Sequence, residues 1–328
     1  MNKRIIALLF FCICLYLPVR AQIIADPMIS VYYADCENCK KLYIAGSLFS
    51  NPAINIPSSA YFIPLQFSGE KFYEPISAKM GEEELFAQDF EGTLFYSIPL
   101  NKENGTAHQN ISFYLRAYAE QKAYMTKDAF QLLIKGNKDF AGEKLILDPF
   151  LYHSYAYQEF SLNYNSLKMI SENKSIAWGV GLSLLNGAFF NELEMEHGSF
   201  YTSATGDSIH AELSFEWIQT DPDQKEFTSS NGFGGALNLH LFYQFENGNS
   251  LYSSVRNLGF IDWNKKGLHY QVDTSIAYNG IDIVNSNPFA EAGILDFDSL
   301  LVNYEVPDRS RHRYYLAPEL NVHFQIHH

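Results

Sequence analysis

Apolar and polar residues alternate along much of this chain, in segments of about eight to thirteen residues. The clearest example is 208–217, SIHAELSFEW, in which Leu213 lies in the middle of an apolar face while Ser, His and Glu occupy the other face. A period of two is typical of a β-strand with one apolar and one wet face. The same pattern predicts about ten strands, near 60–68, 93–100, 111–119, 155–165, 175–187, 208–219, 234–246, 249–258, 269–278 and 314–326.

Two short segments predict helices instead. Thr126 is a suitable N-cap for a helix over 127–135, with Asp128 in the first turn and Gly136 just after the end. A second helix is indicated around 296–304, inside the long insertion that separates the last two predicted strands. The chain is therefore all-β with one or two short helices.

The length of the strands and the character of their polar faces favour one kind of all-β fold. The segments exceed the five or six residues usual for strands, and their wet faces carry mainly Ser, Asn, Gln, Gly and His. We therefore expect residues 59–328 to form an antiparallel transmembrane β-barrel, with a soluble β-sandwich as the alternative. On this interpretation Leu213 faces lipid. The residues expected to face the lumen are His210, Glu212, Glu216, His240, Arg256 and Asp273.

The N-terminal part of the chain predicts export. Residues 1–21 combine a basic start, an apolar run of 13 residues and small residues at the end, which is the layout of a secretory signal peptide. Residues 22–58 lack a long periodic segment and contain Asn51, Pro52 and Ala53, so we expect them to form an irregular plug in the pore. The small residues Ala177, Gly179 and Gly181 would leave room for that plug against the wall.

Composition and charge exclude some classes of partner. The chain has 328 residues, of which 47% are hydrophobic and 18% charged, and its net charge is −14. Binding to nucleic-acid phosphates needs a positive field, so nucleic acid is not an expected partner. The basic cluster of Arg309, Arg311, His312 and Arg313 fits either lipid phosphates or a solvated loop before a strand.

Little in the sequence indicates catalysis. Cys36 and Cys39 form a Cys-x-x-Cys pair, for which a local disulfide, free thiols and a redox role remain open. The ten histidines lack metal-binding spacing, and no nucleophile motif is present. We therefore expect neither an enzyme nor a bound cofactor or metal.

Three stretches carry a resemblance to known outer-membrane proteins. They are 46–53, which ends in Asn-Pro-Ala, then 155–164 followed by 178–183, and 255–263; the short run 133–137 accompanies them. Together they resemble an uncharacterised Gram-negative outer-membrane family, similar in architecture to the fatty-acid-transporter-like barrels. The resemblance implies a barrel in the outer membrane and supplies no substrate or catalytic residue. Because members of that family usually continue with more strands, we expect a barrel that is incomplete at its C-terminus.

These observations predict an outer-membrane protein that binds or passes a small, apolar ligand and contacts outer-membrane lipid. Two alternatives remain open: a structural or assembly partner in the outer membrane, and a secreted soluble β-sandwich that acts as an adhesin or binding module. The identity of protein partners does not follow from the sequence.

Overall fold

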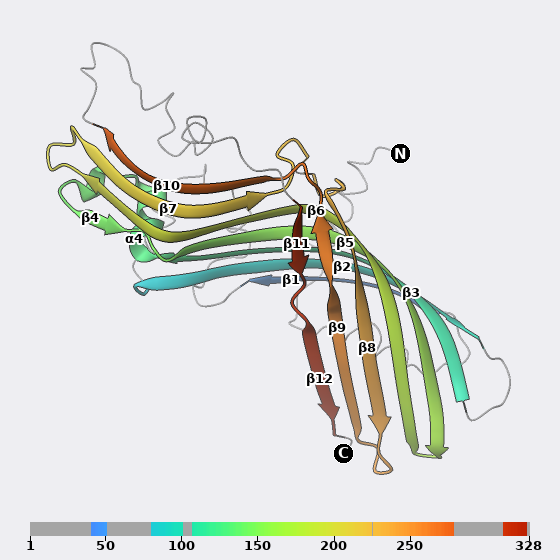
Figure 1. The fold of residues 1–328 in the computed structure, drawn as a ribbon. Coiled ribbons are helices and arrows are strands. Elements are labelled where there is room, and N and C mark those ends of the chain that lie inside the picture. The colour runs from blue at the N-terminus through green and yellow to red at the C-terminus, as the bar shows by residue number, and fades with distance from the viewer. Residues whose placement is uncertain (1–40, 51–79, 101–106, 225, 279–310, 327–328) are drawn as a thin grey trace.

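The structure is a computed structural model that describes residues 41–50, 80–100, 107–224, 226–278 and 311–326. In these residues twelve strands form one antiparallel sheet, accompanied by a single α-helix and a short 3-10 turn (Figure 1). The sheet is open, because β1 and β12 do not pair with each other. The strands are β1 (Lys41–Ser50), β2 (Glu83–Pro99), β3 (Ala107–Thr126), β4 (Lys144–Ile146), β5 (Phe150–Ser171), β6 (Lys174–Thr202), β7 (Ile209–Gln219), β8 (Gly232–Gln244), β9 (Ser250–Trp263), β10 (Leu268–Tyr278), β11 (His312–Tyr315) and β12 (Glu319–Gln325).

The long strand β6 belongs to two arms of the sheet. On one side it pairs with β5 over most of its length. On the other side its first half pairs with β8 and its second half with β7. We call the part built on β8, β9 and β12 the β8–β12 arm, and the part that contains β7, β10, β4 and the helix the α4 arm; they diverge in Figure 1.

A β-bulge in β6 lies where the two arms meet. Tyr157 of β5 pairs with Gly187 and its neighbour Ala156 pairs with Phe189, so Ala188 is an extra residue without a partner in the register. A bulge of this kind shifts by one the positions that point to each face. Consequently the face that carries even-numbered β6 residues in the β8–β12 arm carries odd-numbered ones from Phe189 to Met195, until a second register shift at Glu196 restores even numbers.

The α4 arm has an ordinary apolar core. Helix α4 (Lys127–Lys135) begins at Thr126, whose hydroxyl accepts a hydrogen bond from the Ala129 amide at 3.1 Å, and ends at Gly136 with φ 74°. Its apolar side covers one face of the sheet, where Phe130 stacks on Phe86 at 5.3 Å. The buried members of this core are Met80, Met125, Ala129, Phe130, Leu132, Leu145, Leu147, Met195, Phe215 and Val272.

This core corrects one prediction from the sequence. Phe215 of β7 is 5% exposed within the core, and Leu213 and Trp217 pack against it. The apolar face of 208–217 therefore packs against protein, and the expectation that Leu213 faces lipid is wrong. Alternation identified the strand correctly, but an apolar face covered by a helix gives the same pattern as one covered by lipid.

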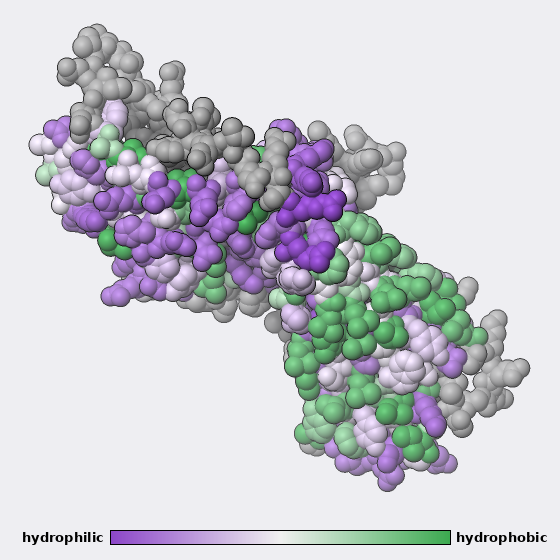
Figure 2. Space-filling view, viewed as in Figure 1, coloured by the Kyte–Doolittle hydropathy of each residue, from purple (hydrophilic) through white to green (hydrophobic). Residues whose placement is uncertain are grey.

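The β8–β12 arm has the opposite distribution of polarity. Its outer face carries large apolar side chains with high exposure, such as Leu182 at 68% and Phe233 at 65%. Figure 2 shows this apolar surface over the lower part of the molecule, while the α4 arm is mainly hydrophilic. The inner face buries mostly polar residues, interleaved with the aromatic rings of Phe95, Tyr114, Phe242 and Tyr252. The buried polar ones are Ser112, Arg116, Glu159, Ser161, Asn163, Asn165, Ser183, Asn238, His240 and Ser254.

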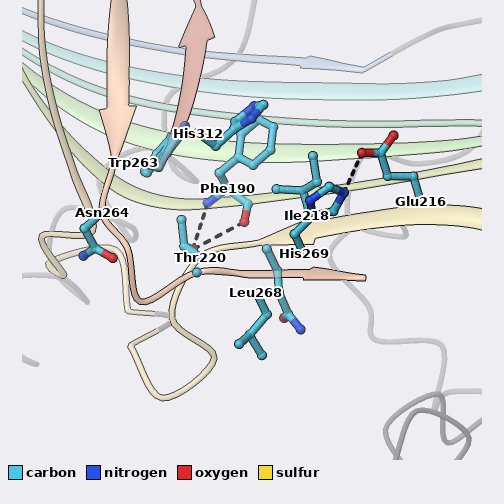
Figure 3. Close-up of a pocket in the computed structure, with 11 residues that line it drawn as sticks. Phe190, Glu216, Ile218, Thr220, Trp263, Asn264, Leu268, His269 and His312 are labelled. Carbon is cyan, nitrogen blue, oxygen red and sulfur yellow. Dashed lines mark hydrogen bonds and ion pairs between the residues drawn. The ribbon is translucent and has the colours of Figure 1, made fainter. Parts of the chain in front are cut away.

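Aromatic and small residues fill the junction between the arms. Phe190, which follows the bulge, packs on Trp263 at 5.6 Å and on His312 of β11 at 5.1 Å (Figure 3). The Thr220 hydroxyl is 3.1 Å from the Phe190 amide nitrogen and 3.3 Å from its carbonyl oxygen. These contacts hold the end of β7 and the end of β9 beside the same point of β6.

Nine of the ten predicted strands and the helix over 127–135 are confirmed, although most strands are longer than predicted. The last predicted strand, 314–326, is divided into β11 and β12. Residues 41–50, which belong to the predicted plug, form β1 and pair with β2 throughout, so irregular chain is not correct for this part. The signal peptide 1–21, Cys36, Cys39, Asn51–Pro52–Ala53, the strand 60–68 and the helix 296–304 lie outside the described residues. No helix in the described part of the chain is long and apolar enough to cross a membrane.

Candidate functional site: a buried charge cluster

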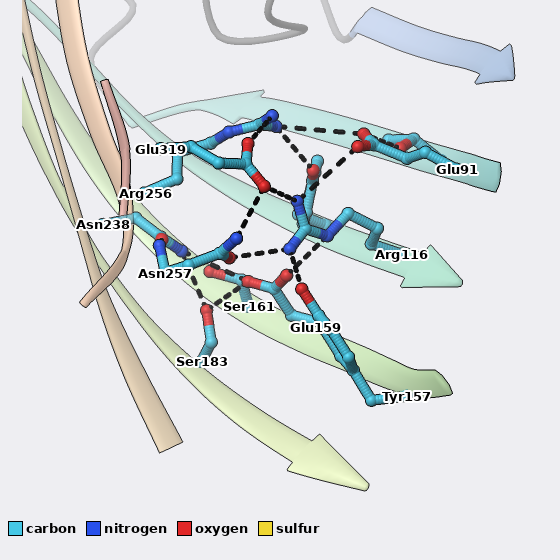
Figure 4. A network of polar contacts seen from close by, with 12 residues as sticks. Glu91, Arg116, Tyr157, Glu159, Ser161, Ser183, Asn238, Arg256, Asn257 and Glu319 are labelled. Atoms are coloured by element: carbon cyan, nitrogen blue, oxygen red, sulfur yellow. Dashed lines mark hydrogen bonds and ion pairs between the residues drawn. The ribbon is translucent and has the colours of Figure 1, made fainter. Parts of the chain in front are cut away.

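Arg116 of β3 is the centre of a charge cluster inside the β8–β12 arm (Figure 4). The residue is only 2% exposed. Its Nε lies 2.9 Å from a carboxylate oxygen of Glu159, and its Nη2 donates to Asn257 Oδ1 at 2.7 Å and to the Tyr157 hydroxyl. Nη1 lies 3.6 Å from a carboxylate oxygen of Glu91 and 3.6 Å from one of Glu319. The guanidinium therefore contacts groups from β2, β5, β9 and β12 at once.

A second arginine completes the cluster from the opposite wall. Arg256 of β9 donates from Nη2 to Glu319 Oε2 at 2.6 Å and from Nη1 to the Tyr114 hydroxyl at 3.1 Å. The same Nη1 lies 3.9 Å from Glu91. Two arginines thus face three glutamates, which leaves a formal charge of −1 in the cluster.

A bulge in β9 gives the cluster two adjacent side chains. Leu237 of β8 pairs with Leu258, and Leu239 pairs with Val255, so Arg256 and Asn257 stand opposite the single residue between them. Asn257 has φ 61°, a left-handed conformation that asparagine tolerates better than most residues. As a result both Arg256 and Asn257 reach the interior, where the Asn257 side chain donates to Glu319 at 2.6 Å.

Neutral hydrogen bonds extend the cluster to β6 and β8. The Ser183 hydroxyl donates to Glu159 Oε1 at 2.6 Å, and Asn238 Nδ2 lies 3.2 Å from the same oxygen. The Asn238 side-chain oxygen accepts from the Asn257 amide at 3.0 Å. The backbone hydrogen bonds of the sheet do not connect β1 to β12. Side-chain contacts across the interior do connect β2, β3 and β5 on one side with β9 and β12 on the other. These contacts hold the opposite sides of the interior together. The buried charges need such partners, because the contacts offset their loss of hydration.

The inner wall next to the cluster is filled rather than vacant. A Cβ on Gly181 would lie 1.8 Å from Asn163 Oδ1, and one on Gly179 would lie 2.0 Å from His240 Nε2. These glycines make room for the side chains of neighbouring strands. The expectation that they leave space for a plug is therefore wrong at these two positions.

Aromatic rings separate the charge cluster from the polar face of the α4 arm. Tyr118 and Tyr157 lie 5.3 Å apart, and His153 lies 5.1 Å from Tyr155. Burial lowers the pKa of His153 below its ordinary value, with Glu120 acting in the opposite direction. Burial also raises the pKa of Tyr314 to about 12, so neither ring carries charge at neutral pH.

The chemistry of the cluster is that of ion pairing rather than of bond breaking. Its members are arginines, glutamates, asparagines, serine and tyrosines, and they hydrogen-bond to one another. Among the described residues no group of three His, Cys, Asp or Glu side chains could hold a metal ion. The arrangement can bind a charged or hydrogen-bonding group, or it can lock the interior.

The six residues predicted to face a lumen lie on one face of the sheet, but only two lie in the β8–β12 arm. Arg256 belongs to the cluster, and His240 is buried over Gly179. The other four are exposed on the β7–β10 pair of the α4 arm, where Asp273 pairs with Ser214 and Glu212 bonds to Ser199. These four are His210, Glu212, Glu216 and Asp273.

The structure also places part of the predicted basic cluster. Arg313 forms a bidentate ion pair with Asp262 at 2.6 and 2.9 Å, and its guanidinium lies 4.5 Å from the centre of the Phe260 ring. His312 lines the junction pocket and Arg311 is exposed, whereas Arg309 lies outside the described residues. These side chains do not converge on a single point.

Sequence reasoning found Arg256 but missed the other four charged members of the cluster. Arg116 and Glu159 each lie in the middle of a long strand, among Ser, Asn, Leu and aromatic neighbours. A charge on the wet face of a predicted membrane strand is itself a signal, because such a side chain needs a partner in the interior. The contacts of Arg116 with Glu91 and Glu319 could not be predicted, because these two glutamates lie far apart in the sequence.

The fold and site define a class of protein: an all-β chain with one open antiparallel sheet and a charge cluster buried between its walls. The chain belongs to the family of unknown function DUF5723, whose model matches residues 48–328. No curated protein and no solved structure matches the chain.

Proposed function

We propose that the protein is an integral outer-membrane protein whose β8–β12 arm lies in lipid as a barrel-like wall. One observation carries the proposal: this arm buries Arg116 and Glu159 while exposing Leu182 and Phe233. A water-soluble β-sandwich has the reverse distribution, since apolar burial stabilises its fold. Polar inside and apolar outside is the pattern of outer-membrane barrels.

The dimensions of the arm fit a bilayer. The alternating outer face runs from Phe233 in β8 to Phe245, one residue beyond the strand, over 12 residue steps. At about 3.3 Å per residue and a tilt of about 45°, this length spans ~28 Å, near the ~25 Å apolar band of outer-membrane barrels. The arm contains eight described strands, and interiors of about this size are filled by side chains.

The connections suggest an orientation. At the far end of the β8–β12 arm, β5 joins β6 and β8 joins β9 by short turns. At the other end the chain passes through α4 and β4, and through the longer 220–231 connection. Outer-membrane barrels have short turns on the periplasmic side and longer loops outside. We place the α4 arm on the extracellular side.

The ligand that this interior suits is small and polar. The described inner wall near the cluster presents Asn163, His240 and Ser254 among its buried residues. A lining of polar side chains favours a ligand that can itself form hydrogen bonds over an apolar one. We propose a non-catalytic protein that binds or passes a small polar ligand, with the charge cluster closing the path.

Matched arginine substitutions test the membrane proposal. Leu182 in the β8–β12 arm and Ile146 in the α4 arm are both exposed, at 68% and 44%. In a soluble protein both changes to arginine would be nearly neutral. In a bilayer Leu182→Arg costs about 2–4 kcal/mol if it lies near the midplane, and Ile146→Arg remains near neutral.

The measurement is folding into lipid vesicles, followed by the mobility difference between boiled and unboiled samples on a gel. A Leu182→Arg protein that inserts as well as wild type, or a wild type recovered without membranes, contradicts the proposal. Passage is measured separately, as the efflux of a small neutral sugar from vesicles. Arg116→Ala should raise the efflux, because it removes the largest side chain of the cluster.

A second candidate function, that of an assembly partner, is favoured by the edge of the sheet. Leu320, Val322 and Phe324 of β12 are exposed on one face, and Asn321 and His323 on the other. Within the described residues no strand pairs with the outer edge of β12. Lipid cannot satisfy an open edge, so a strand from a partner would stabilise it. Cross-linking from a cysteine at Val322 in intact membranes distinguishes a partner protein from a lone chain.

A further inference from the structure

A pocket at the junction of the two arms is separate from the charge cluster. It has a volume of about 260 Å³ and lies between the ends of β7 and β9 and the start of β10 and β11 (Figure 3). This is below the roughly 300–1,000 Å³ of sites for drug-sized ligands, so one small ring is the natural occupant. Its lining includes Phe190, Glu216, Ile218, Trp263, His269 and His312.

Trp263 gives this pocket a donor without an acceptor. The residue is 2% exposed, and its Nε1 has no hydrogen-bond partner among the described residues. The opposite edge of the indole rests on the sheet, because a Cβ on Gly187 would lie 2.4 Å from Cζ3 and one on Gly232 would lie 2.6 Å from Cε3. Buried Trp N–H groups usually find a partner. Less than 1 Å² of this nitrogen is accessible, so a ligand oxygen in the pocket would supply the acceptor after a small movement of the lining side chains.

The other side of the pocket offers an acceptor. His269 Nε2 lies 2.6 Å from Glu216 Oε1, and both side chains are partly exposed. An ionised carboxylate accepts several hydrogen bonds, so Glu216 can take another from a ligand hydroxyl. Figure 3 shows Glu216 and Trp263 on opposite sides, with Phe190 and Ile218 between them.

We propose that this pocket binds a single neutral sugar ring, with one hydroxyl oxygen accepting from Trp263 Nε1 and another hydroxyl donating to Glu216. Each hydroxyl of a sugar both donates and accepts, which fits the two unlike ends of the pocket. The C–H face of the ring would pack on Phe190, since aromatic surface is a good partner for weakly polar faces. The Glu216 carboxylate disfavours an anionic ligand by like-charge repulsion.

The charge state of His312 supports a neutral ligand. Burial, with His269 nearby, lowers the pKa of His312, although Glu216 acts in the opposite direction. The His312 ring is therefore neutral at pH 7 and does not attract an anion. In the orientation proposed above, the pocket lies just outside the apolar band on the extracellular side. The proposal of sugar binding is independent of the membrane proposal, because the pocket is formed by the protein alone.

Isothermal titration of the full-length protein in detergent micelles tests the proposal. The probes are the methyl glycosides of glucose, galactose and mannose, with glucuronate as the anionic control. We expect saturable binding of at least one methyl glycoside, and glucuronate at least tenfold weaker. Absence of saturable binding for all three glycosides, or glucuronate binding as tightly, overturns the proposal.

Two variants connect the binding to this pocket. Trp263→Phe keeps an aromatic ring and removes the N–H, so one hydrogen bond is lost. Glu216→Gln keeps the shape and removes the charge, so a charge-assisted hydrogen bond becomes a weaker neutral one. Each change should weaken binding about tenfold. Trp217→Phe is the matched control, because Trp217 Nε1 already donates to Asn191 at 2.7 Å. Should Trp263→Phe fail to fold, the exposed Glu216→Gln decides the question. Unchanged affinity in the folded variants refutes the assignment.

Discussion

Replacing Arg116 by methionine tests whether the charge cluster holds the interior of the β8–β12 arm together. Methionine fills a similar volume but removes the contacts to Glu159 at 2.9 Å, to Asn257 at 2.7 Å and to the Tyr157 hydroxyl. The formal charge of the cluster would change from −1 to −2, because Arg256 then faces three glutamates alone. Breaking a buried ion pair on one side typically costs 3–5 kcal/mol, and we expect Arg116→Met to lie in that range.

The assay is urea unfolding in lipid vesicles or micelles, followed by tryptophan fluorescence. Arg313→Met is the matched control, since Arg313 also forms a bidentate pair with a carboxylate, at 2.6 and 2.9 Å, but both side chains are exposed. Such a pair is worth about 0–1 kcal/mol. The double variant Arg116→Met/Glu159→Gln should recover about 1–2 kcal/mol, because one unpaired buried carboxylate is gone.

A cost below about 1 kcal/mol for Arg116→Met, equal to that of Arg313→Met, would refute the reasoning. It would mean that water solvates the remaining carboxylates, and hence that the interior is wet and the cluster does not lock it. If Arg116→Met does not fold at all, the milder variant Glu159→Gln is measured in its place. We expect it to lower the free energy of unfolding by about 1–3 kcal/mol, because it weakens the hydrogen bonds to Arg116 and Ser183.

Two further predictions concern packing and pH. Gly181→Ala should cost about 1–3 kcal/mol in chemical unfolding, because its Cβ would lie 1.8 Å from Asn163 Oδ1; Gly81→Ala, with its nearest atom at 3.5 Å, should be near neutral, and equal costs would contradict the packing. The pKa of His153 is lowered by burial, so its contribution to stability is intact above the unfolded pKa of about 6.5 and is lost as the pH falls below it. His153→Gln should therefore lose less unfolding free energy than wild type between pH 7 and pH 5, and parallel losses would refute a buried neutral ring.

Local chemistry explains which parts of the fold could be predicted. Thr126 and Gly136 mark the two ends of α4 correctly, because a cap and a left-handed stop act on neighbouring residues. Alternation located most strands for the same reason. It ended the β6 prediction at residue 187, one residue before the extra Ala188, because the bulge breaks the period of two.

Pairing over long distances explains what could not be predicted. Leu213 and Leu182 have the same alternating context, yet Leu213 packs against the apolar core of the α4 arm and Leu182 is exposed. Leu213 lies in β7, which pairs with the second half of β6, whereas Leu182 lies in the first half of β6, which pairs with β8. The local pattern of apolar and polar residues does not reveal this pairing. For the same reason the sequence did not reveal the partners of Arg116, which come from the four strands β2, β5, β9 and β12.

The bulge at Ala188 has a consequence for how the chain tolerates length changes. The bulge accommodates one extra residue, since the apolar side uses even numbers before Ala188 and odd numbers from Phe189 to Met195, up to a second register shift at Glu196. Deleting Ala188 would straighten the strand while leaving every side chain of both arms on its present side. Deleting Leu184 instead would either distort the strand further or turn the preceding part of β6 over, with Trp178 and Leu182 inward and Gly181 and Ser183 outward. Single-residue deletions in β6 should therefore be tolerated at Ala188 and destabilising within 175–187, where the pairing with β5 and β8 is regular.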